Sequence, residues 1–581
     1  MKTTNGTGDN REIRHMAESK VLPLKEAVTR YVKPGILLHL AGGIGGPSAA
    51  ICEIIRQYHG RSPGFGLIQS TVTGHAINLL HLGMIRRLFF SACADISTSG
   101  RPSRVMQQAW EEKSIDLENW SLCALQQRLM AGALGMSFMP TRSISGSSMA
   151  TDGRESFREI ADPFGGDGSI GLAQALNPDV SIVHGCVADE YGNTILPIPY
   201  GEDVWGPLAA GDVLVTVEKL VSTDFIRQHA ALVKLPGHIV SAVSVAPMGL
   251  HPFALPVPGL AGLDAYETDT EFLLELHRAF ADSGKLDNWI KEWVLDCTTQ
   301  EAYLEKLGNG RVQSLGHVPA GEPERPAVPG TTTAETTYSH EEAVLVAAAR
   351  EITKSVLASG HRIILVGAGS RAAAVLLAYH QLRERGYELD IVTGNGQIGY
   401  EPGTGALGAQ GLSAVYTSKM VTDTVTLQGV FIGGRHSRCL SVLGVGQIDK
   451  NGNTNSTLTA EGQFLVGSGG ANDAANAREV LVIVNQSKDR FPEELSYITC
   501  PGDRVTTVVS TMGIFRKPSG KGELRLAACL PDNDTITIEE RIQQVQDNCS
   551  WPLVTAEDVE VIPGPTSEEL TLLRRLLPVR S

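Results

Sequence analysis

The amino-acid sequence predicts an α/β protein made of two homologous units, each built on an open and mainly parallel sheet. Three observations support this prediction: each half opens with an apolar strand that runs into a glycine turn, each half carries the pattern D-x-x-G-N-T, and a segment rich in Pro, Gly and Thr separates them. A chain of 581 residues also exceeds what one hydrophobic core usually serves. We therefore expect two large units.

The composition is that of a folded protein with many strand-to-helix turns. Hydrophobic residues make up 42% of the chain and charged residues 19%, and there are 62 glycines. The formal net charge of -15 disfavours nonspecific binding to nucleic acid phosphates, although a local basic pocket for an anionic ligand is compatible with it. We expect no nucleic acid partner.

The cysteines and the apolar segments bear on where the chain is located. The nine cysteines are scattered singly, without a CxxC pair, as is typical of reduced thiols. The N-terminal segment is polar, and no run of about 18 apolar residues occurs. We therefore expect a cytoplasmic protein with no membrane partner.

The boundary between the two units is predicted from composition and periodicity. Residues 309–338 are rich in Pro, Gly and Thr and show no helical or strand period, which predicts a linker. The residues just before it repeat apolar positions every three or four residues, and a new helical pattern begins at His340. The predicted units are residues 1–308 and 339–581.

Glycine turns follow the first apolar strand of each half, in residues 41–46 (AGGIGG) and 367–370 (GAGS). Backbone N–H groups at the start of the helix that follows such a turn suit a phosphate or a developing oxyanion. Neither turn has the spacing GxGxxG or GxxxxGK[ST], so a tight structural turn is an equal alternative.

The pattern D-x-x-G-N-T occurs at residues 189–194 and again at residues 449–454, after a β-type apolar run in both places. One copy indicates only a turn after a strand, but two copies in the same order indicate two homologous units. Ligands of such parallel sheets bind beyond the C-terminal ends of the strands. The group His184, Cys186, Asp189 and Glu190 near the first copy lacks metal-ligand spacing, and we expect no metal site.

Several stretches together resemble a known family, the type I coenzyme A transferases. In the first half they are AGGIGG at 41–46 and LENWSLCALQQRLMAGALGMSFMPTRS at 117–143. In the second half they are VGAGS at 366–370, VTGNGQIGYEP at 392–402, LGVGQIDKNGNTN at 443–455 and VGSGGANDAANAREVLVIVNQSKDRF at 466–491. The first half is similar to the α-subunit, and the second half to the β-subunit, especially of the glutaconate type. The resemblance implies an acyl-CoA substrate, a cleft between the halves and a homodimer. It implies no permanently bound cofactor, since coenzyme A belongs to the substrate.

The resemblance also draws attention to a missing side chain. In the family's transferases a glutamate in a turn of the β half attacks the thioester. That turn corresponds here to TGNG at residues 393–396, and the residue that matches the glutamate is Gly394. Glycine has no carboxylate, so transfer through a glutamyl-CoA intermediate at this position is excluded. We therefore predict hydrolysis, decarboxylation or carbon–carbon cleavage of a CoA ester. The alternatives are a transferase that uses another carboxylate or direct attack by the acceptor, and a catalytically silent acyl-CoA-binding protein.

Three side chains are candidates for the missing chemistry. Glu118 is the first candidate base, because the family motif that contains it lines the cleft; the alternative is a solvated glutamate at a helix start. His75 is a possible acid or base, against the more common role of a structural histidine. Glu401 is a possible displaced carboxylate, against an exposed loop residue. Cys123 is expected to be a small buried residue rather than a nucleophile.

Binding residues are predicted from the same resemblance. The backbone around Gly394 and Asn395 is a candidate oxyanion pocket, with a turn retained for shape as the alternative. Arg142 is a candidate for a substrate carboxylate or, equally, for a carboxylate of the protein. Small residues are needed where the pantetheine arm passes close to the backbone. The glycines predicted to contact coenzyme A are Gly42, Gly43, Gly45, Gly444, Gly446, Gly467, Gly469 and Gly470.

Overall fold

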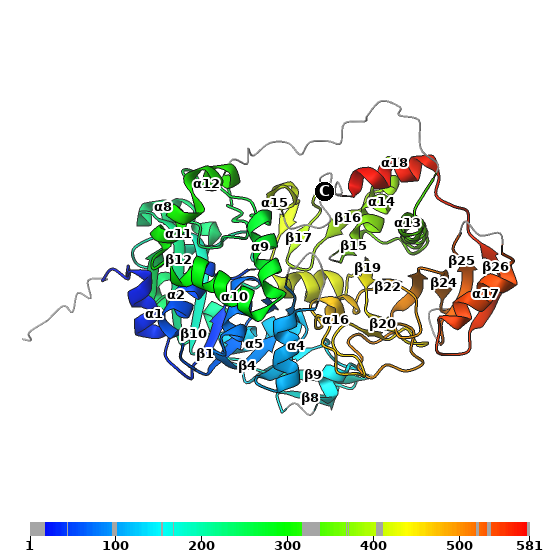
Figure 1. Ribbon diagram of the computed structural model, residues 1–581, viewed down its shortest axis with the longest axis horizontal. Coiled ribbons are helices and arrows are strands. Elements are labelled where there is room, and N and C mark those ends of the chain that lie inside the picture. The colour runs from blue at the N-terminus through cyan, green and yellow to red at the C-terminus, as the bar shows by residue number, and fades with distance from the viewer. Residues whose placement is uncertain are drawn as a thin grey trace, which may run out of the picture.

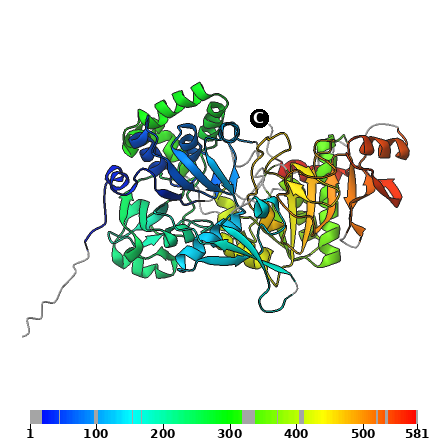
Figure 2. The same ribbon diagram turned by 90° about the horizontal axis from the view of Figure 1, so that it is seen from below.

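The computed structural model shows the two halves of the chain side by side (Figure 1). In Figures 1 and 2, the blue-to-green ribbons of the first half lie mainly on one side and the ribbons of the second half, light green through yellow to red, mainly on the other. The structure describes residues 18–42, 45–95, 102–152, 155–166, 168–316, 337–367, 369, 371–402, 411–518, 522–531 and 536–577.

A nine-stranded sheet forms the centre of the first half. Seven strands run parallel in the order β6-β4-β2-β1-β10-β12-β14, and β11 and β13 continue antiparallel from the end of β10. All nine residues of β10 are buried, as expected for a parallel strand covered on both faces. The strands are β1 (Leu37–Leu40), β2 (Phe65–Ile68), β4 (Ile85–Phe90), β6 (Asp116–Asn119), β10 (Val180–Ala188), β11 (Thr194–Ile195), β12 (Asp212–Leu220), β13 (Val233–Leu235) and β14 (Ala242–Val245).

Helices cover this sheet, and six of the twelve described α-helices of this half begin at a side-chain cap that satisfies a free backbone N–H group. Ser121, for example, accepts a hydrogen bond from the N–H group of Ala124 at the start of α5. The helices are α1 (Leu24–Tyr31), α2 (Ser48–Tyr58), α3 (His75–His81), α4 (Arg104–Glu112), α5 (Leu122–Ala133), α6 (Ser148–Thr151), α7 (Trp205–Ala209), α8 (Thr223–Gln228), α9 (Thr270–Phe280), α10 (Ser283–Ile290), α11 (Gln300–Leu307) and α12 (Asn309–Gly316), with 3-10 turns η1 (Ala230–Leu232) and η2 (Gly237–Ile239) and the π-helix η3 (Lys291–Leu295).

The helical period before the predicted linker is confirmed by α9, α10 and α11. The prediction for the start of the linker was wrong, because Asn309–Gly316 forms α12. No residue of α12 is fully buried, which explains why its sequence shows no clear apolar stripe. The remainder of the predicted linker up to residue 336 lies outside the described residues.

Two smaller sheets complete the first half. An antiparallel sheet in the order β7-β9-β8 is built from β7 (Phe138–Thr141), β8 (Phe157–Ala161) and β9 (Ser169–Gln174), and β3 (Thr71–Val72) pairs with β5 (Ala92–Cys93). β7 is the next element after α5, so the FMPTRS stretch begins as a strand of this small sheet and continues past its end.

A ten-stranded sheet forms the centre of the second half, in the order β18-β17-β16-β15-β19-β22-β23-β24-β25-β26. Its strands are β15 (Ile363–Val366), β16 (Asp390–Val392), β17 (Gln397–Ile398), β18 (Met420–Val421), β19 (Cys439–Gly444), β22 (Glu479–Val484), β23 (Val505–Ser510), β24 (Gly513–Arg516), β25 (Arg525–Cys529) and β26 (Val554–Val561). β20 (Gln447–Ile448) pairs separately with β21 (Thr454–Asn455).

The helices of this half are α13 (His340–Ser359), α14 (Ala372–Glu384), α15 (Leu412–Thr417), the π-helix η4 (Val425–Ile432), α16 (Ala471–Ala474), α17 (Ile538–Asp547) and α18 (Ser567–Leu576). Reciprocal capping boxes begin α13, α17 and α18. Among the described helices, none combines the length and the apolar character needed to cross a membrane. All nine cysteines are free and buried.

The predicted homology of the two halves is confirmed by their strand order. The parallel strands β2-β1-β10-β12-β14 of the first half correspond, in chain order and in neighbours, to β16-β15-β19-β22-β23 of the second. In both halves the strand that starts the unit lies inside the sheet, with the second strand on one side of it and the last three strands of the shared order on the other. The mainly parallel α/β fold is therefore present twice.

The D-x-x-G-N-T turns have the same hydrogen bonds in both halves. Asp189 accepts from the N–H group of Asn193 through Oδ1 and from its amide through Oδ2, each at 2.9 Å. Asp449 accepts from Asn453 in the same two ways, each at 2.9 Å. The asparagine Oδ1 then accepts from a backbone N–H group of a later loop at 2.8 Å in both cases. The repeated pattern is thus a structural turn that follows β10 and β20.

Candidate active site between the two halves

The glycine loop after β21, residues 466–470, joins the second half to the first. The N–H groups of Cys93 and Leu122 donate to the carbonyl oxygens of Val466 and Gly469 at 2.8 and 2.9 Å, and Asn119 Oδ1 accepts from the N–H group of Ser468 at 3.2 Å. These contacts place the start of α16 directly against the start of α5.

Glycine is required at the centre of this loop. Gly467 has a φ of +104°, and a Cβ atom there would overlap the carbonyl oxygen of Ser91. Gly469 also has a positive φ, of +49°, but its nearest neighbour would be Ala92 Cβ at 3.8 Å. The glycines predicted to contact coenzyme A in this loop therefore also serve the contact between the halves.

A cavity of about 900 Å³ lies beside this contact and is lined by both halves. The first half contributes residues from α5, from the end of β7 and from the start of β9, and the second half contributes residues from η4, α16 and the loop 501–504. π-helical turns such as η4 occur frequently at functional sites. The cavity is a candidate for the cleft expected between the halves.

A buried carboxylate from α16 lines the cavity. Asp473 Oδ2 accepts a hydrogen bond of 2.8 Å from the backbone N–H group of Cys123, in the first turn of α5. Burial raises the pKa of the Asp473 carboxyl to about 6, and the hydrogen bond from Cys123 acts in the opposite direction. The preceding residue, Asn472, accepts from the N–H group of Ile144 at 2.7 Å, so α16 is attached to the first half at two points.

The turn that contains Gly394 lies behind a glutamine in the cavity wall. Gln428 of η4 lines the cavity, is 2% exposed, and donates from Nε2 to the carbonyl oxygen of Gly394 at 3.3 Å. A Cβ atom added at Gly394 or at Gly470 would lie 3.1 Å from this same Nε2 atom. Asn395 accepts a hydrogen bond from the hydroxyl of Thr393, which fixes its side chain within the turn.

Glu118 has a different environment from the one predicted. It lies on the edge strand β6, is 8% exposed, and forms ion pairs with Arg87 and with Arg128, the latter at 3.7 Å. Trp120 Nε1 also donates to its carboxylate at 3.2 Å. Glu118 is neither a solvated helix-start residue nor part of the cavity wall, and two guanidinium groups already neutralise it. Its location favours a structural role.

His75 lies in the core of the first half. It is 1% exposed, its Nδ1 atom is 3.6 Å from Cys52 Sγ, and its ring centroid is 5.6 Å from that of Trp289. Burial is the main cause that lowers the pKa of His75 to about 3, so the ring is neutral at physiological pH. His75 does not line the cavity between the halves, and its location favours the structural alternative.

Glu401 is also not among the residues that line the cavity. The hydroxyl of Tyr379 donates to its Oε2 atom at 3.3 Å, and Arg383 lies 3.8 Å from its Oε1 atom. Its environment is therefore that of a partly exposed ion-paired residue and gives no support to a displaced nucleophile. Cys123, by contrast, does line the cavity, but burial raises the pKa of its thiol well above the usual value and favours the neutral form.

The first glycine turn is a tight structural turn. A Cβ atom at Gly42, where φ is +115°, would lie 2.9 Å from Gly46 Cα, and one at Gly45 would overlap the ring of Phe253. Gly43 lies outside the described residues. In the second half, Gly446 packs against the carbonyl oxygen of Asn455.

Gly444 is the most open of these predicted glycines. It is exposed, and a Cβ atom there would lie 3.6 Å from Arg371 Cγ, an ordinary contact. The space around Gly444 is thus compatible with a passing ligand.

Arginines accompany Asp473 at the cavity. Arg142, Arg435 and Arg504 all line it and are exposed, and the structure gives none of the three an ion pair among the residues it describes. Arg142 donates one long hydrogen bond of 3.5 Å to the carbonyl oxygen of Gly433. Within the described residues, Arg142 therefore does not neutralise a carboxylate of the protein, and three cationic groups are available for an anionic ligand.

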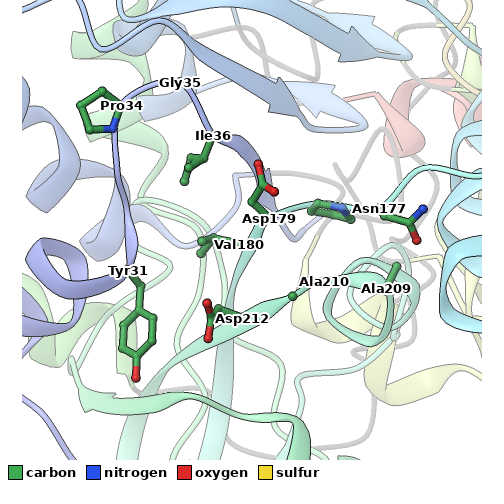
Figure 3. A pocket seen from close by; sticks show the side chains of 12 residues that line it. Tyr31, Pro34, Gly35, Ile36, Asn177, Asp179, Val180, Ala209, Ala210 and Asp212 are labelled. Atoms are coloured by element: carbon green, nitrogen blue, oxygen red, sulfur yellow. The ribbon is translucent and has the colours of Figure 1, made fainter.

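A second hollow, of about 820 Å³, lies at the opposite end of the first sheet (Figure 3). Asp179 and Asp212 line it just before or at the start of β10 and β12. Asp179 Oδ2 accepts from the N–H group of Leu37, and Asp212 Oδ1 from the hydroxyl of Ser241, each at 2.7 Å. Since ligands of parallel sheets bind at the carboxyl ends of the strands, this hollow is not a candidate site. Within the described residues no group of three or more potential metal ligands is present.

Two residues at the cavity were missed by the sequence prediction. Asp473 stands within the SGGAND stretch, and its position one turn after a glycine loop is a usable signal for a helix start. Gln428 gave no signal, because it lies in an apolar segment (TLQGVFI) that folds as a π-helix. Its contact with Gly394 depends on how two distant segments of the second half pack.

Sequence and structure comparisons identify relatives of both halves. The sequence model of the coenzyme A transferase family matches residues 21–246. One chain of the glutaconate CoA-transferase of Acidaminococcus fermentans is 28% identical over 317 residues, which cover 52% of this chain and 96% of that one. The 3-oxoadipate CoA-transferase of Pseudomonas knackmussii is similar through both of its chains. The first is 27% identical over 50% of this chain and its own full length, and the second is 28% identical over 41% of this chain and 93% of its own.

The fold as a whole is found in a solved structure. An acyl-CoA transferase from Escherichia coli O157:H7, solved as a thioester complex with CoA, superimposes with a TM-score of 0.66 over 97% of this chain and 98% of that one. Its sequence identity is 14%, so this likeness concerns the fold alone. The match extends over both halves, as expected if both belong to one architecture.

Proposed function

We propose that this chain, a member of the coenzyme A transferase family with an α-like and a β-like half in one polypeptide, processes an acyl-CoA without forming a glutamyl-CoA intermediate. The reaction is hydrolysis, decarboxylation or carbon–carbon cleavage of a CoA ester. The observation that carries the proposal is that Gln428, in the wall of the cavity between the halves, donates to the carbonyl oxygen of Gly394 behind it, and Gly394 is the position to which the family resemblance assigns a nucleophilic glutamate.

The geometry supports a role for each group at this site. The turn of Gly394 and Asn395 lies behind Gln428 of the cavity wall, and its backbone N–H groups are the proposed donors to the acyl carbonyl. Arg142 binds a carboxylate or another anionic group of the acyl chain through its planar fork. Coenzyme A belongs to the substrate, and its arm passes near the open Gly444. No resident cofactor is needed for these steps.

Oligomeric state, location and domain boundaries complete the proposal. We place the two functional units at residues 1–308, extended by α12 (Asn309–Gly316), and at residues 339–581, and the protein in the cytoplasm as a homodimer. Residues of both halves of one chain line the cavity.

A CoA-transferase remains the second candidate function. The observation in its favour is Asp473, a carboxylate in the same cavity that could take the place of the absent glutamate as nucleophile. In a third possibility, acyl-CoA binds in the cavity without turnover.

Trapping of covalent intermediates separates these functions. The purified full-length chain is mixed with a panel of acyl-CoA esters, with and without acceptor acids, and free CoA thiol is measured. We expect thiol release in the absence of an acceptor, and no CoA bound to protein after borohydride or hydroxylamine treatment. Protein-bound CoA would show a covalent transferase, and tight acyl-CoA binding with no product would show the silent alternative.

A further inference from the structure

We propose that Asp473 is the proton-transferring group of the cavity and that it activates water for attack on the thioester. This inference rests on the proposed function and names its reaction as hydrolysis. It follows from a buried carboxylate of the second half whose position is fixed by the backbone of the first half.

The two oxygens of the Asp473 carboxylate have different surroundings. Oδ2 is held at 2.8 Å by the N–H group of Cys123, at the N-terminus of the twelve-residue helix α5. Oδ1 is buried and accepts no hydrogen bond of good geometry from the described residues, although Ser121 and Ser143 lie close enough for their side chains to lower the pKa of the carboxyl. A carboxylate held through one oxygen by the backbone of the other half, in the wall of a cavity, is placed to accept a proton from a water molecule bound there.

Charged and titratable groups surround Asp473 on several elements. Cys123 of α5 and Cys500, which directly precedes the loop 501–504, are both neutral thiols, since burial raises their pKa values. Arg142, Arg435 and Arg504 line the same cavity from three segments, with Asp162 and Asp503. Asp423 is the remaining nearby acid, through its charge effect on Cys123.

The protonation behaviour of Asp473 fits this role. Burial raises the pKa of its carboxyl to about 6, so the group is largely ionised at pH 7 and can accept a proton. This pKa is also close enough to neutral pH for the protonated carboxyl to release the proton again within one catalytic cycle. The other candidate carboxylates, Glu118 and Glu401, are ion-paired to arginines outside the cavity.

The proposed step balances with water as the only co-reactant. The Asp473 carboxylate accepts a proton from water while the water oxygen bonds to the thioester carbonyl carbon and the carbonyl π electrons move to the carbonyl oxygen. When that double bond forms again, the C–S bond breaks and its electron pair leaves with sulfur. The proton on Asp473 then passes to the CoA thiolate. The products are a carboxylic acid and the CoA thiol.

The first test measures the pH profile of thioester hydrolysis by the full-length chain and by three variants. In the wild type, kcat/KM should fall as the pH decreases through about 6, because the base becomes protonated. Asp473→Asn should lose this inflection and about 100- to 10,000-fold of the rate. Its amide oxygen can still accept from Cys123, so folding should be preserved. Asp473→Glu should recover part of the rate, and Asp224→Asn, on the exposed helix α8, serves as the matched control.

The second test distinguishes a base from a nucleophile. In a single turnover in ¹⁸O-water, attack by water places the label in the product acid and leaves the Asp473 carboxylate unlabelled, as mass spectrometry of the peptide would show. Label in Asp473 would overturn the inference in favour of a covalent role. A rate and pH profile unchanged in Asp473→Asn would overturn the inference while the proposed function stands. No turnover of any ester by the wild type would overturn the proposed function and the inference with it.

Discussion

At the scale of single residues, Gly394 is distinguished from the glycines around it by its backbone. Gly396, two residues later, has a φ of +112°, and a Cβ atom there would overlap the carbonyl oxygen of Thr422. Gly394 does not adopt the left-handed conformation, and its Cβ would meet only the amide end of Gln428. The backbone thus requires glycine at 396 but accepts a side chain at 394. The absence of a carboxylate at 394 is a chemical feature of this chain.

The first prediction concerns these two glycines. Gly394→Glu should change the free energy of unfolding by no more than about 1 kcal/mol, because Gln428 can move aside. Gly396→Ala should destabilise the protein by about 2 kcal/mol or more, owing to strain and overlap. Denaturant unfolding measures both. Equal destabilisation by the two variants would contradict the conclusion that the backbone requires glycine at 396 but not at 394. A separate experiment, hydroxylamine trapping of Gly394→Glu with acyl-CoA, would show whether the rest of a transferase site survives.

The second prediction concerns Glu202, a carboxylate at another contact between the halves. It is 3% exposed, accepts a hydrogen bond from the hydroxyl of Thr424 at 3.0 Å, and has a pKa raised by burial to about 7. In the unfolded chain Glu202 ionises near pH 4.5, so its burial costs stability progressively from pH 4.5 to 7 and by a constant amount above that. Glu202→Gln should remove this cost.

The variant's gain in unfolding free energy should be absent near pH 4, rise through pH 4.5 to 7, and level off at no more than about 3 kcal/mol. Urea unfolding of both proteins across this range measures it. A gain that is the same at pH 4 and pH 8 would show that the effect does not come from ionisation of Glu202.

At the scale of elements, sequence patterns predicted the turns and helices whose structure depends on residues close together in the chain. The glycine turns, the D-x-x-G-N-T turns and the helices α9 to α11 each depend on a few neighbouring residues, and all were predictable from spacing. The environments of Glu118 and His75 were not predictable, since they depend on Arg128 and Trp289, which come from other segments of the fold. The pairing of Gln428 with Gly394 depends likewise on packing between distant segments.

The third prediction concerns the loop 466–470 that joins the halves. Gly467→Ala should destabilise the protein by about 2 kcal/mol or more, because a methyl group would overlap the carbonyl oxygen of Ser91 and φ is +104°. Gly469→Ala is the matched control: its Cβ would be in ordinary contact at 3.8 Å, so only the left-handed φ adds a cost of about 1 kcal/mol. Thermal and denaturant unfolding compare the two, and a larger loss for Gly469→Ala would contradict the proposed contact.

At the scale of the whole molecule, one strand order occurs twice and the two copies have diverged in use. The glycine turn of the first half is occupied by its own chain, through Gly46 and Phe253, whereas the second half supplies the loop, the π-helix and the carboxylate at the cavity. The duplicated fold therefore forms one cavity to which the two halves contribute different elements. The duplication could be predicted from repeated sequence patterns, whereas the different contributions of the two halves to the cavity could not.

The hydrogen bond from Cys123 to Asp473 ties the acid–base group of one half to the backbone of the other. Carrying both halves on one polypeptide fixes their stoichiometry at one to one and makes their docking an intramolecular event that does not depend on dilution. If the two pieces were produced separately, activity would have to be recovered by complementation, and its concentration dependence would report the strength of the contact that the single chain provides.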